Sequence, residues 1–483
     1  MMCCPRSPGR PGARSGPLYG SIMRSSDSDR VYLAPVDHLR AAAAVLVVLY
    51  HGCQLFTARL EGGGAFTAET GWLYSANPAA TLVFEGHTAV ALFMVLSGFI
   101  FTVGAHGRPI RYGRFVTNRL LRVYPLYLVV AVLGLATQVA LVSYEDVLRL
   151  LTFATPGQPY GGVFWTLSVE VQFYLLFPLL NRLLTERGPG ALLRLLGAVA
   201  LLRVLVWLSS PVPEPPTTAL YLGLAGRIDQ FLLGMLAAWW YLRRGERAGG
   251  RWPAWAALGP AVVALWSYNQ LHGFVSDSPL KLVWGTVEGA VWALFVAVYV
   301  TGADATGRAD ATGRADATGR AAPGGGATPA AVPGPAGRAG REGPGWRAWR
   351  EGPGWLSRGA ARLGEVSYSV YLTHFMVLTV LGEYAGRVLA AVPLPPVWAA
   401  FALTAAVALP LTVALSFLTY HAVELPFLKL RRPYLGAAEA APAGAAEAMG
   451  TRAWAATDGP GGTPRPRRRE ADRGRWGVPG RHG

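Results

Sequence analysis

Charged residues are scarce in this chain of 483 residues: Asp, Glu, Lys and Arg make up only 15%, whereas 52% of the residues are hydrophobic. A soluble protein usually carries about 25% charged residues. Cysteine is scarce too, because Cys3, Cys4 and Cys53 form neither a disulfide framework nor a metal-binding spacing. These shortages argue against a soluble enzyme and against a disulfide-stabilised secreted domain, and they indicate a membrane protein.

The first 30 residues have no apolar run and are rich in Arg, Ser and Gly. We therefore expect segment 1–30 to be disordered and to contain no cleavable signal peptide, so that the first membrane helix acts as the insertion signal.

Ten apolar stretches of about 20 residues come next, each long enough to cross a bilayer. Helices must be the spanning element, because lipid offers no hydrogen-bond partner to free backbone groups. The sequence therefore predicts an all-α, polytopic membrane helix bundle of about ten transmembrane helices. The predicted spans are 34–55, 84–103, 120–142, 163–183, 192–209, 219–242, 253–271, 282–301, 366–390 and 397–420.

Arg and Lys are distributed unevenly between alternate loops. If the N-terminus is cytoplasmic, the short inner loops 104–119, 182–194 and 243–251 contain eleven of them, and the five outer loops contain four. This bias places both termini in the cytoplasm. The net charge of +16 could indicate a nucleic-acid binder. The basic residues flank the spans, however, and we predict no nucleic-acid partner.

Segment 302–362 is of low complexity and contains three copies of Ala-Asp-Ala-Thr-Gly-Arg at 303–320. A polar six-residue repeat cannot bury a core, so we predict a disordered cytoplasmic linker. It separates helices 1–8 of the membrane domain, at 31–301, from helices 9–10, at 363–430. The basic segment 431–483 is predicted to be a disordered tail.

Polar residues within the spans are the candidates for function, because each charge costs about 2.5–3.5 kcal/mol on insertion scales. Asp37 and Arg40 lie three residues apart on one face at the inner end of the first span. His51 lies about 16 Å farther along the helix axis, towards the outer side. It could be hydrogen-bonded between helices, the more frequent case, or it could remove a proton from a hydroxyl group.

Arg119 and Arg122 share a helical face at the cytoplasmic boundary of the third span. Two guanidinium groups in this arrangement suit a ligand that carries phosphates. Ordinary anchoring at the membrane surface accounts for them equally well.

Glu170 lies in the outer half of the fourth span. It could be the ion-pair partner of Arg227 or Arg203, or it could orient a histidine or an acceptor. Arg227 and Asp229 are two residues apart and do not face each other on a helix, so we expect each to pair elsewhere.

The ninth span carries Ser367, Tyr371 and His374 on one helical face. His374 lies near the middle of the membrane, where a lone histidine is more often structural. Ser97 and Gly98 of the second span are small residues, which favour close packing between helices.

Taken in order, seven segments resemble the acyltransferase 3 family of bacterial integral-membrane O-acyltransferases, which acylate sugars and natural products. The resemblance extends from about residue 31 to 430. Its segments are Asp37-His38-Leu39-Arg40 with Tyr50-His51, Leu92 to Phe99, Arg119-x-x-Arg122 with Tyr124-Pro125, Trp165 to Tyr174, Arg227 to Gly234, Ser367 to His374, and Glu424-Leu-Pro-Phe427. The chain departs from the family at His38, often Gly, at Ala91, often Asp, and at Leu425, usually Arg.

The resemblance implies roles for individual residues. His51 matches the proposed catalytic histidine of the family, and Glu170 matches an acidic residue that is commonly needed for activity. Arg119 and Arg122 match a motif associated with the acyl-CoA donor. We assign supporting roles to Asp37, Arg40, Arg227 and His374.

The implied activity is O-acyl transfer in the bacterial plasma membrane. An acyl group, most simply acetyl, would pass from cytoplasmic acyl-CoA to a hydroxyl of a carbohydrate, glycolipid or secreted metabolite. We expect acyl-CoA as co-substrate, contact with membrane lipid, and no bound cofactor or metal. The alternative is a transporter or flippase that uses the same intramembrane charges. It is disfavoured because the sequence shows no internal repeat and no paired helices broken by Gly or Pro.

Overall fold

The computed structural model describes most of the membrane domain, and within these parts the chain is helical, with one isolated β-bridge and no strand. The predicted segment 1–30 lies outside them. The described residues are 33–62, 71–136, 143–153, 163–209, 221–244, 254–276, 278–317, 355–389 and 393–436.

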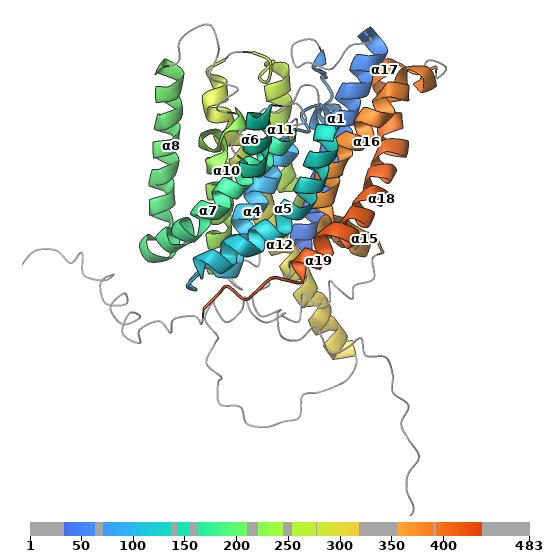
Figure 1. The fold of residues 1–483 in the computed structure, drawn as a ribbon. Coiled ribbons are helices and arrows are strands. Elements are labelled where there is room, and N and C mark those ends of the chain that lie inside the picture. Colours follow the sequence, from blue (N-terminus) through green and yellow to red (C-terminus); the bar gives the residue numbers. More distant parts are fainter. Residues whose placement is uncertain are drawn as a thin grey trace, which may run out of the picture. The chain divides into compact units, whose positions relative to one another are not determined.

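Each of the ten predicted spans coincides with a helix or a run of helices (Figure 1). The single helices are α1 (Ala34–Gly62), α4 (Thr88–Ala105), α5 (Tyr112–Ala136), α7 (Phe164–Arg187), α8 (Pro189–Ser209), α10 (Leu224–Arg244), α11 (Ala254–Gln270), α12 (Leu280–Ala317) and α16 (Ser367–Leu389). The tenth is the run α17 (Pro396–Leu403), η4 (Thr404–Ala408), α18 (Leu409–Thr419), η5 (Tyr420–Glu424) and α19 (Leu425–Leu428), in which η4 and η5 are π-helical. Three shorter helices are α3 (Pro78–Phe84), α6 (Tyr144–Thr152) and α15 (Trp355–Glu365).

Seven of the described helices are long and apolar enough to cross a membrane. The other three predicted spans correspond to α10, α11 and α16. Helix α11 has only 17 residues, about 26 Å, and α10 carries Arg227 and Asp229 near its start. The chain is thus a helical membrane protein, while the count of ten spans and the cytoplasmic position of the termini remain predictions.

The surface of α8 supports this conclusion. Leu193, Leu201, Leu205 and Leu208 are exposed on it, and little of the helix is buried in the protein. An apolar helix that presents leucines outward is suited to lipid rather than to water.

Helix α4 is the most enclosed element, because nearly all its residues are buried. It packs closely on α10 through two glycines. A Cβ atom at Gly98 would lie 2.1 Å from the Phe231 carbonyl oxygen, and one at Gly234 would lie 2.1 Å from that of Val95. The close-packing role predicted for Gly98 is therefore confirmed.

The predicted linker 302–362 is too long at both ends. Helix α12 continues to Ala317, through two and a half of the hexapeptide repeats, and α15 begins at Trp355. An Ala-containing repeat can extend a helix that the preceding span has already nucleated, since each added residue contributes one further hydrogen bond. Residues 318–354 lie outside the described parts.

The predicted disordered tail 431–483 begins too early as well. The Asn118 side chain exchanges two hydrogen bonds with the backbone of Arg432, at 2.7 and 3.0 Å, and Leu435 forms a β-bridge with Ile110. Tyr434 and Leu435 are buried, so their apolar side chains hold this segment in place. Residues 437–483 lie outside the described parts.

Candidate active site

The histidines of the first and ninth spans contact each other. His51 of α1 and His374 of α16 are 323 residues apart in sequence, and His374 Nε2 lies 3.1 Å from His51 Nδ1. Their rings are stacked, with centroids 5.1 Å apart. His374 is fully buried and His51 is half-buried. The structure thus joins one predicted catalytic residue to one predicted supporting residue.

The hydrogen bonds of this pair determine where the protons lie when both rings are neutral. His374 Nδ1 lies 2.6 Å from the carbonyl oxygen of Tyr371, which can only accept, so Nδ1 carries the proton. His374 Nε2 is then an acceptor, and His51 Nδ1–H donates to it. His51 Nε2 therefore carries no proton and is available as a base.

Neighbouring elements fix the two rings. A Cβ atom at Gly52 would lie 2.3 Å from a side-chain carbon of Thr404, so this glycine lets η4 approach α1 directly beside His51. One turn before His374, the hydroxyl of Tyr371 accepts a hydrogen bond from Thr166 at 2.8 Å and donates to the Val163 carbonyl at 3.1 Å. The ninth span is thereby tied to α7.

Glu170 of α7 lies elsewhere. It is half-buried, and Ser97 Oγ of α4 donates to its Oε1 at 3.2 Å. Among the described residues no hydrogen bond or ion pair joins Glu170 to His51. Nor does Glu170 pair with Arg227 or Arg203, so that structural interpretation of Glu170 is wrong.

Arg122 is partly buried and has two partners in the protein. Its Nη1 forms an ion pair of 2.8 Å with Glu424, and its Nη2 donates to the Glu365 carbonyl at 3.1 Å. Glu424 is fully buried and also accepts a hydrogen bond from the hydroxyl of Ser369. The charge of Arg122 is therefore already compensated, and the residue ties α5 to α16 and η5.

Arg119 has no carboxylate partner among the described residues. Its guanidinium carbon lies 4.7 Å from the ring centroid of Phe101, 5.3 Å from that of Phe115 and 5.9 Å from that of Tyr434. Its Nε is buried without a hydrogen-bond partner in the described parts. The aromatic rings fix the position of this cation and leave its charge uncompensated.

The profile of a family described as an acyltransferase domain, acyltransferase 3, matches residues 34–308. The chain belongs to this acyltransferase family. No curated protein and no solved structure matches it. The matched residues include His51, Arg119, Arg122 and Glu170, whereas His374 and Glu424 lie beyond them.

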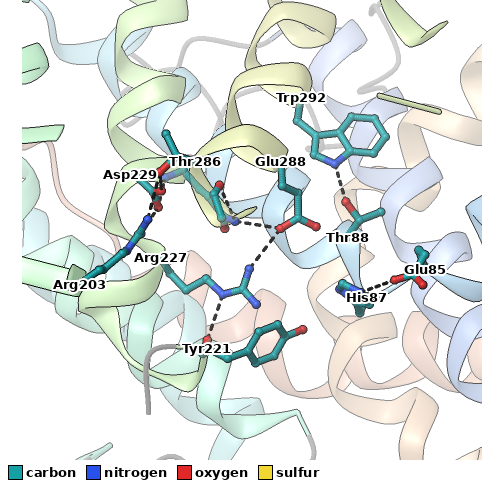
Figure 2. A network of polar contacts seen from close by, with 12 residues as sticks. Glu85, His87, Thr88, Arg203, Tyr221, Arg227, Asp229, Thr286, Glu288 and Trp292 are labelled. Atoms are coloured by element: carbon teal, nitrogen blue, oxygen red, sulfur yellow. Dashed lines mark hydrogen bonds and ion pairs between the residues drawn. The ribbon is translucent and has the colours of Figure 1, made fainter. Parts of the chain in front are cut away.

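Several further polar residues of this acyltransferase pair as the sequence predicts. Arg40 Nη1 lies 3.3 Å from Asp37 Oδ1, which confirms that the two residues share a face of α1. Arg227 and Asp229 do pair elsewhere, since Arg203 Nη2 lies 2.8 Å from Asp229 and Arg227 Nη1 lies 3.4 Å from Glu288 (Figure 2).

The acyltransferase also has a buried pair that the sequence analysis missed. His87 Nε2 lies 2.9 Å from Glu85 Oε2, just before α4 (Figure 2). Glu85 Oε1 accepts hydrogen bonds from Trp72 Nε1 at 3.1 Å and from Asn269 Nδ2 at 2.7 Å. Glu288 was missed too. Glu85 and His87 lie at the edge of the predicted span 84–103, whereas Glu288 lies within the span 282–301, where an ionisable residue was the signal that could have found it.

Proposed function

We propose that this membrane acyltransferase transfers an acyl group, most simply acetyl, from cytoplasmic acyl-CoA to a hydroxyl group. The acceptor would be a carbohydrate, a glycolipid or a secreted metabolite, and the site of action the bacterial plasma membrane. The observation that carries the proposal is the contact between His51 and His374, which leaves His51 Nε2 unprotonated.

In the proposed reaction, His51 Nε2 accepts the hydroxyl proton while the hydroxyl oxygen attacks the thioester carbonyl carbon. A carbon–oxygen bond forms and the carbon–sulfur bond breaks. The proton then passes from His51 to the departing thiolate, so that the products are the ester and CoA. His374 acts as a positioning residue, because its Nε2 accepts the Nδ1–H of His51 and stabilises the transient imidazolium.

The donor phosphates are expected at Arg119 rather than equally at both arginines. Arg119 has no carboxylate partner and an unpartnered Nε among the described residues, whereas Arg122 is already paired with Glu424. A guanidinium group without a carboxylate partner is the stronger phosphate ligand. We propose that Arg122 supports the donor site indirectly, by holding α5 against α16.

Glu170 interacts electrostatically with one tyrosine near the two arginines and with one near the two histidines. Tyr174 is within electrostatic range of Glu170 and of both Arg119 and Arg122. Tyr371, one turn before His374, is within range of Glu170 as well. These two interactions support the proposal that Glu170, which accepts a hydrogen bond from Ser97, contacts the arm of the donor that links its phosphates to the thioester.

The function can be tested by adding radiolabelled acetyl-CoA to membranes that contain the protein. We expect label in envelope glycans, glycolipids or released metabolites, and a loss of at least about 100-fold in His51→Ala. His421→Ala, which removes an exposed histidine of η5, is the matched control and should retain full activity.

Full activity of His51→Ala, or failure of the wild-type protein to bind acetyl-CoA, would overturn the proposal. Substrate movement across vesicles in the absence of acyl-CoA would instead favour a transporter.

A further inference from the structure

Helix α15 precedes the ninth span and is too short to be a span itself, because it has only 11 residues. It is fixed against the start of α1. A Cβ atom at Gly364 would lie 2.0 Å from the carbonyl oxygen of Asp37. The carbonyl oxygen and the hydroxyl oxygen of Ser357 each lie 3.1 Å from His38 Nε2. These contacts bring α15 to the end of the bundle at which α1 begins.

The same contacts show that α15 crosses α1 obliquely. Ser357 and Gly364 are seven residues apart, about 10 Å along the axis of α15. Their partners, His38 and Asp37, are adjacent in α1 and belong to its first turns. An element at the end of a membrane span lies at the level of the lipid headgroups. Helix α15 is therefore positioned at the membrane boundary.

The last residue of α15 connects the helix to two further elements. Arg122 Nη2 of α5 donates to the Glu365 carbonyl at 3.1 Å, and the hydroxyl of Tyr420 in η5 donates to Glu365 Oε1 at 2.9 Å. The carboxylate of α15 is thus engaged by η5. With both ends of the helix held, its outward face has a fixed orientation.

The outward face of α15 combines an aromatic ring with two cations. Trp355, Arg358 and Arg362 have the i, i+3, i+7 spacing that places side chains on one side of a helix, and all three are exposed. Trp355 is 73% exposed and its neighbour Leu356 is 65% exposed. Tryptophan at the end of a span, beside basic residues, is typical of the interface between membrane and water.

The chemistry of this face indicates a phosphate ligand that adjoins hydrocarbon. Two guanidinium groups one turn apart suit phosphate oxygens. The exposed Trp355 and Leu356 favour lipid phosphates over those of a soluble donor, because a bilayer presents its phosphates directly above an apolar phase. Basic residues together with Trp and Leu are the composition of helices that lie at a membrane surface. A net negative headgroup complements Arg358 and Arg362.

We propose that Trp355, Arg358 and Arg362 form a binding site for the headgroup of an anionic phospholipid. The two arginines bind its phosphate, while Trp355 and Leu356 insert at the edge of the hydrocarbon. This site is independent of acyl transfer and would remain if the proposed function failed.

Lipid binding to the full chain in detergent tests the site, with native mass spectrometry as the measurement. The probes are dioleoyl phosphatidylglycerol, which is anionic, and dioleoyl phosphatidylcholine, which has the same acyl chains and no net charge. We expect the wild-type protein to bind the first molecule of phosphatidylglycerol at least ten times more tightly than phosphatidylcholine, because each arginine near the surface adds to the attraction. Equal affinities for the two lipids overturn the proposal.

Substitutions separate the contribution of charge from that of insertion. The double variant Arg358→Gln, Arg362→Gln should lower the preference for phosphatidylglycerol to less than threefold. Trp355→Ser should weaken the binding of both lipids by a similar factor and leave the preference unchanged, because it removes no charge. An unchanged preference in the double variant would contradict the site.

A second double variant is the matched control. Arg187→Gln, Arg194→Gln removes two exposed cations, one at the end of α7 and one in the second turn of α8. It should keep the preference for phosphatidylglycerol within twofold of the wild-type value. An equal fall in both double variants would indicate general electrostatic attraction and overturn the site.

The affinity for acetyl-CoA distinguishes lipid phosphate from donor phosphate. The Kd of acetyl-CoA should change less than twofold in the variant that lacks Arg358 and Arg362. A tenfold rise in this Kd with an unchanged lipid preference would assign the two arginines to the donor and overturn the lipid site.

Discussion

The two histidines and the two arginines of the candidate site differ in how sequence distance relates to contact. His51 and His374 come from helices far apart in the sequence, yet their rings are in direct contact. Arg119 and Arg122 share one face of α5, yet Arg122 is paired with Glu424 and Arg119 is surrounded by aromatic rings. Proximity in sequence therefore does not make two residues a functional unit, and distance does not prevent it.

The difference between the histidine pair and the arginine pair predicts different effects of double substitutions. Residues in one hydrogen-bond chain should show non-additive mutational effects, whereas residues with separate partners should behave independently. We expect the histidines to act as one unit in catalysis. The arginines should separate into one residue that stabilises the fold and one that binds the donor.

The largest expected effect is on the histidine pair. We expect His51→Ala to lower acetyl transfer by about a thousandfold, the usual range for a lost general base. Adding His374→Ala should lower it less than threefold further, because His374 acts only through His51. Rates with saturating labelled acetyl-CoA measure this. Additive losses in the double variant would show that His374 has a separate role.

Removing Arg122 should have the next largest effect, on stability. Arg122→Met leaves the fully buried Glu424 without its cation, and breaking such a pair costs about 3–5 kcal/mol. Thermal unfolding in detergent measures the loss. The double variant Arg122→Met, Glu424→Leu should recover most of it, since no buried charge remains. No recovery would mean that the contact with the Glu365 carbonyl matters more than the ion pair.

The positioning role of His374 predicts a smaller loss. His374→Phe keeps a ring but removes the acceptor of His51 Nδ1–H, a bond to a transiently charged group that is worth about 1.5–3 kcal/mol. The value of kcat should fall roughly tenfold to a hundredfold. The KM for acetyl-CoA should change less than twofold. A rise in KM with unchanged kcat would place His374 in substrate binding instead.

Arg119 should show the smallest effect, and only on the donor. Arg119→Gln should raise the Kd of acetyl-CoA about tenfold, as expected for one charge-assisted hydrogen bond. The salt dependence of binding should weaken in parallel. Arg114→Gln, which removes an exposed cation of the same helix, is the matched control. An equal weakening by both substitutions would indicate general electrostatic attraction rather than a specific contact.

The helices were predictable from the sequence because an apolar run of about 20 residues is long enough to span a bilayer as a helix. The separate pairing of Arg227 and Asp229 could be predicted from helix geometry alone. Contacts between helices were not predictable in this way. The partnership of Arg122 with Glu424 depends on the packing of α5 against η5, and no local spacing encodes it.

Other misses have different physical causes. Glu85 and His87 stand in the turn ahead of α4, where a polar pair looks like the edge of a loop until Trp72 and Asn269 are seen to enclose it. The first residues of the tail look polar, but two buried side chains, Tyr434 and Leu435, hold them in place.

The repeats at the end of α12 have an evolutionary consequence. Identical adjacent hexapeptides are the kind of sequence in which replication slippage adds or deletes copies in frame. One copy more or fewer changes the length of a helix by about 9 Å and rotates the residues beyond it by about 240°. Glu288, which pairs with Arg227, precedes the first copy at residue 303. A change in repeat number would therefore alter the reach of α12 and leave the pairing of Glu288 with Arg227 in place.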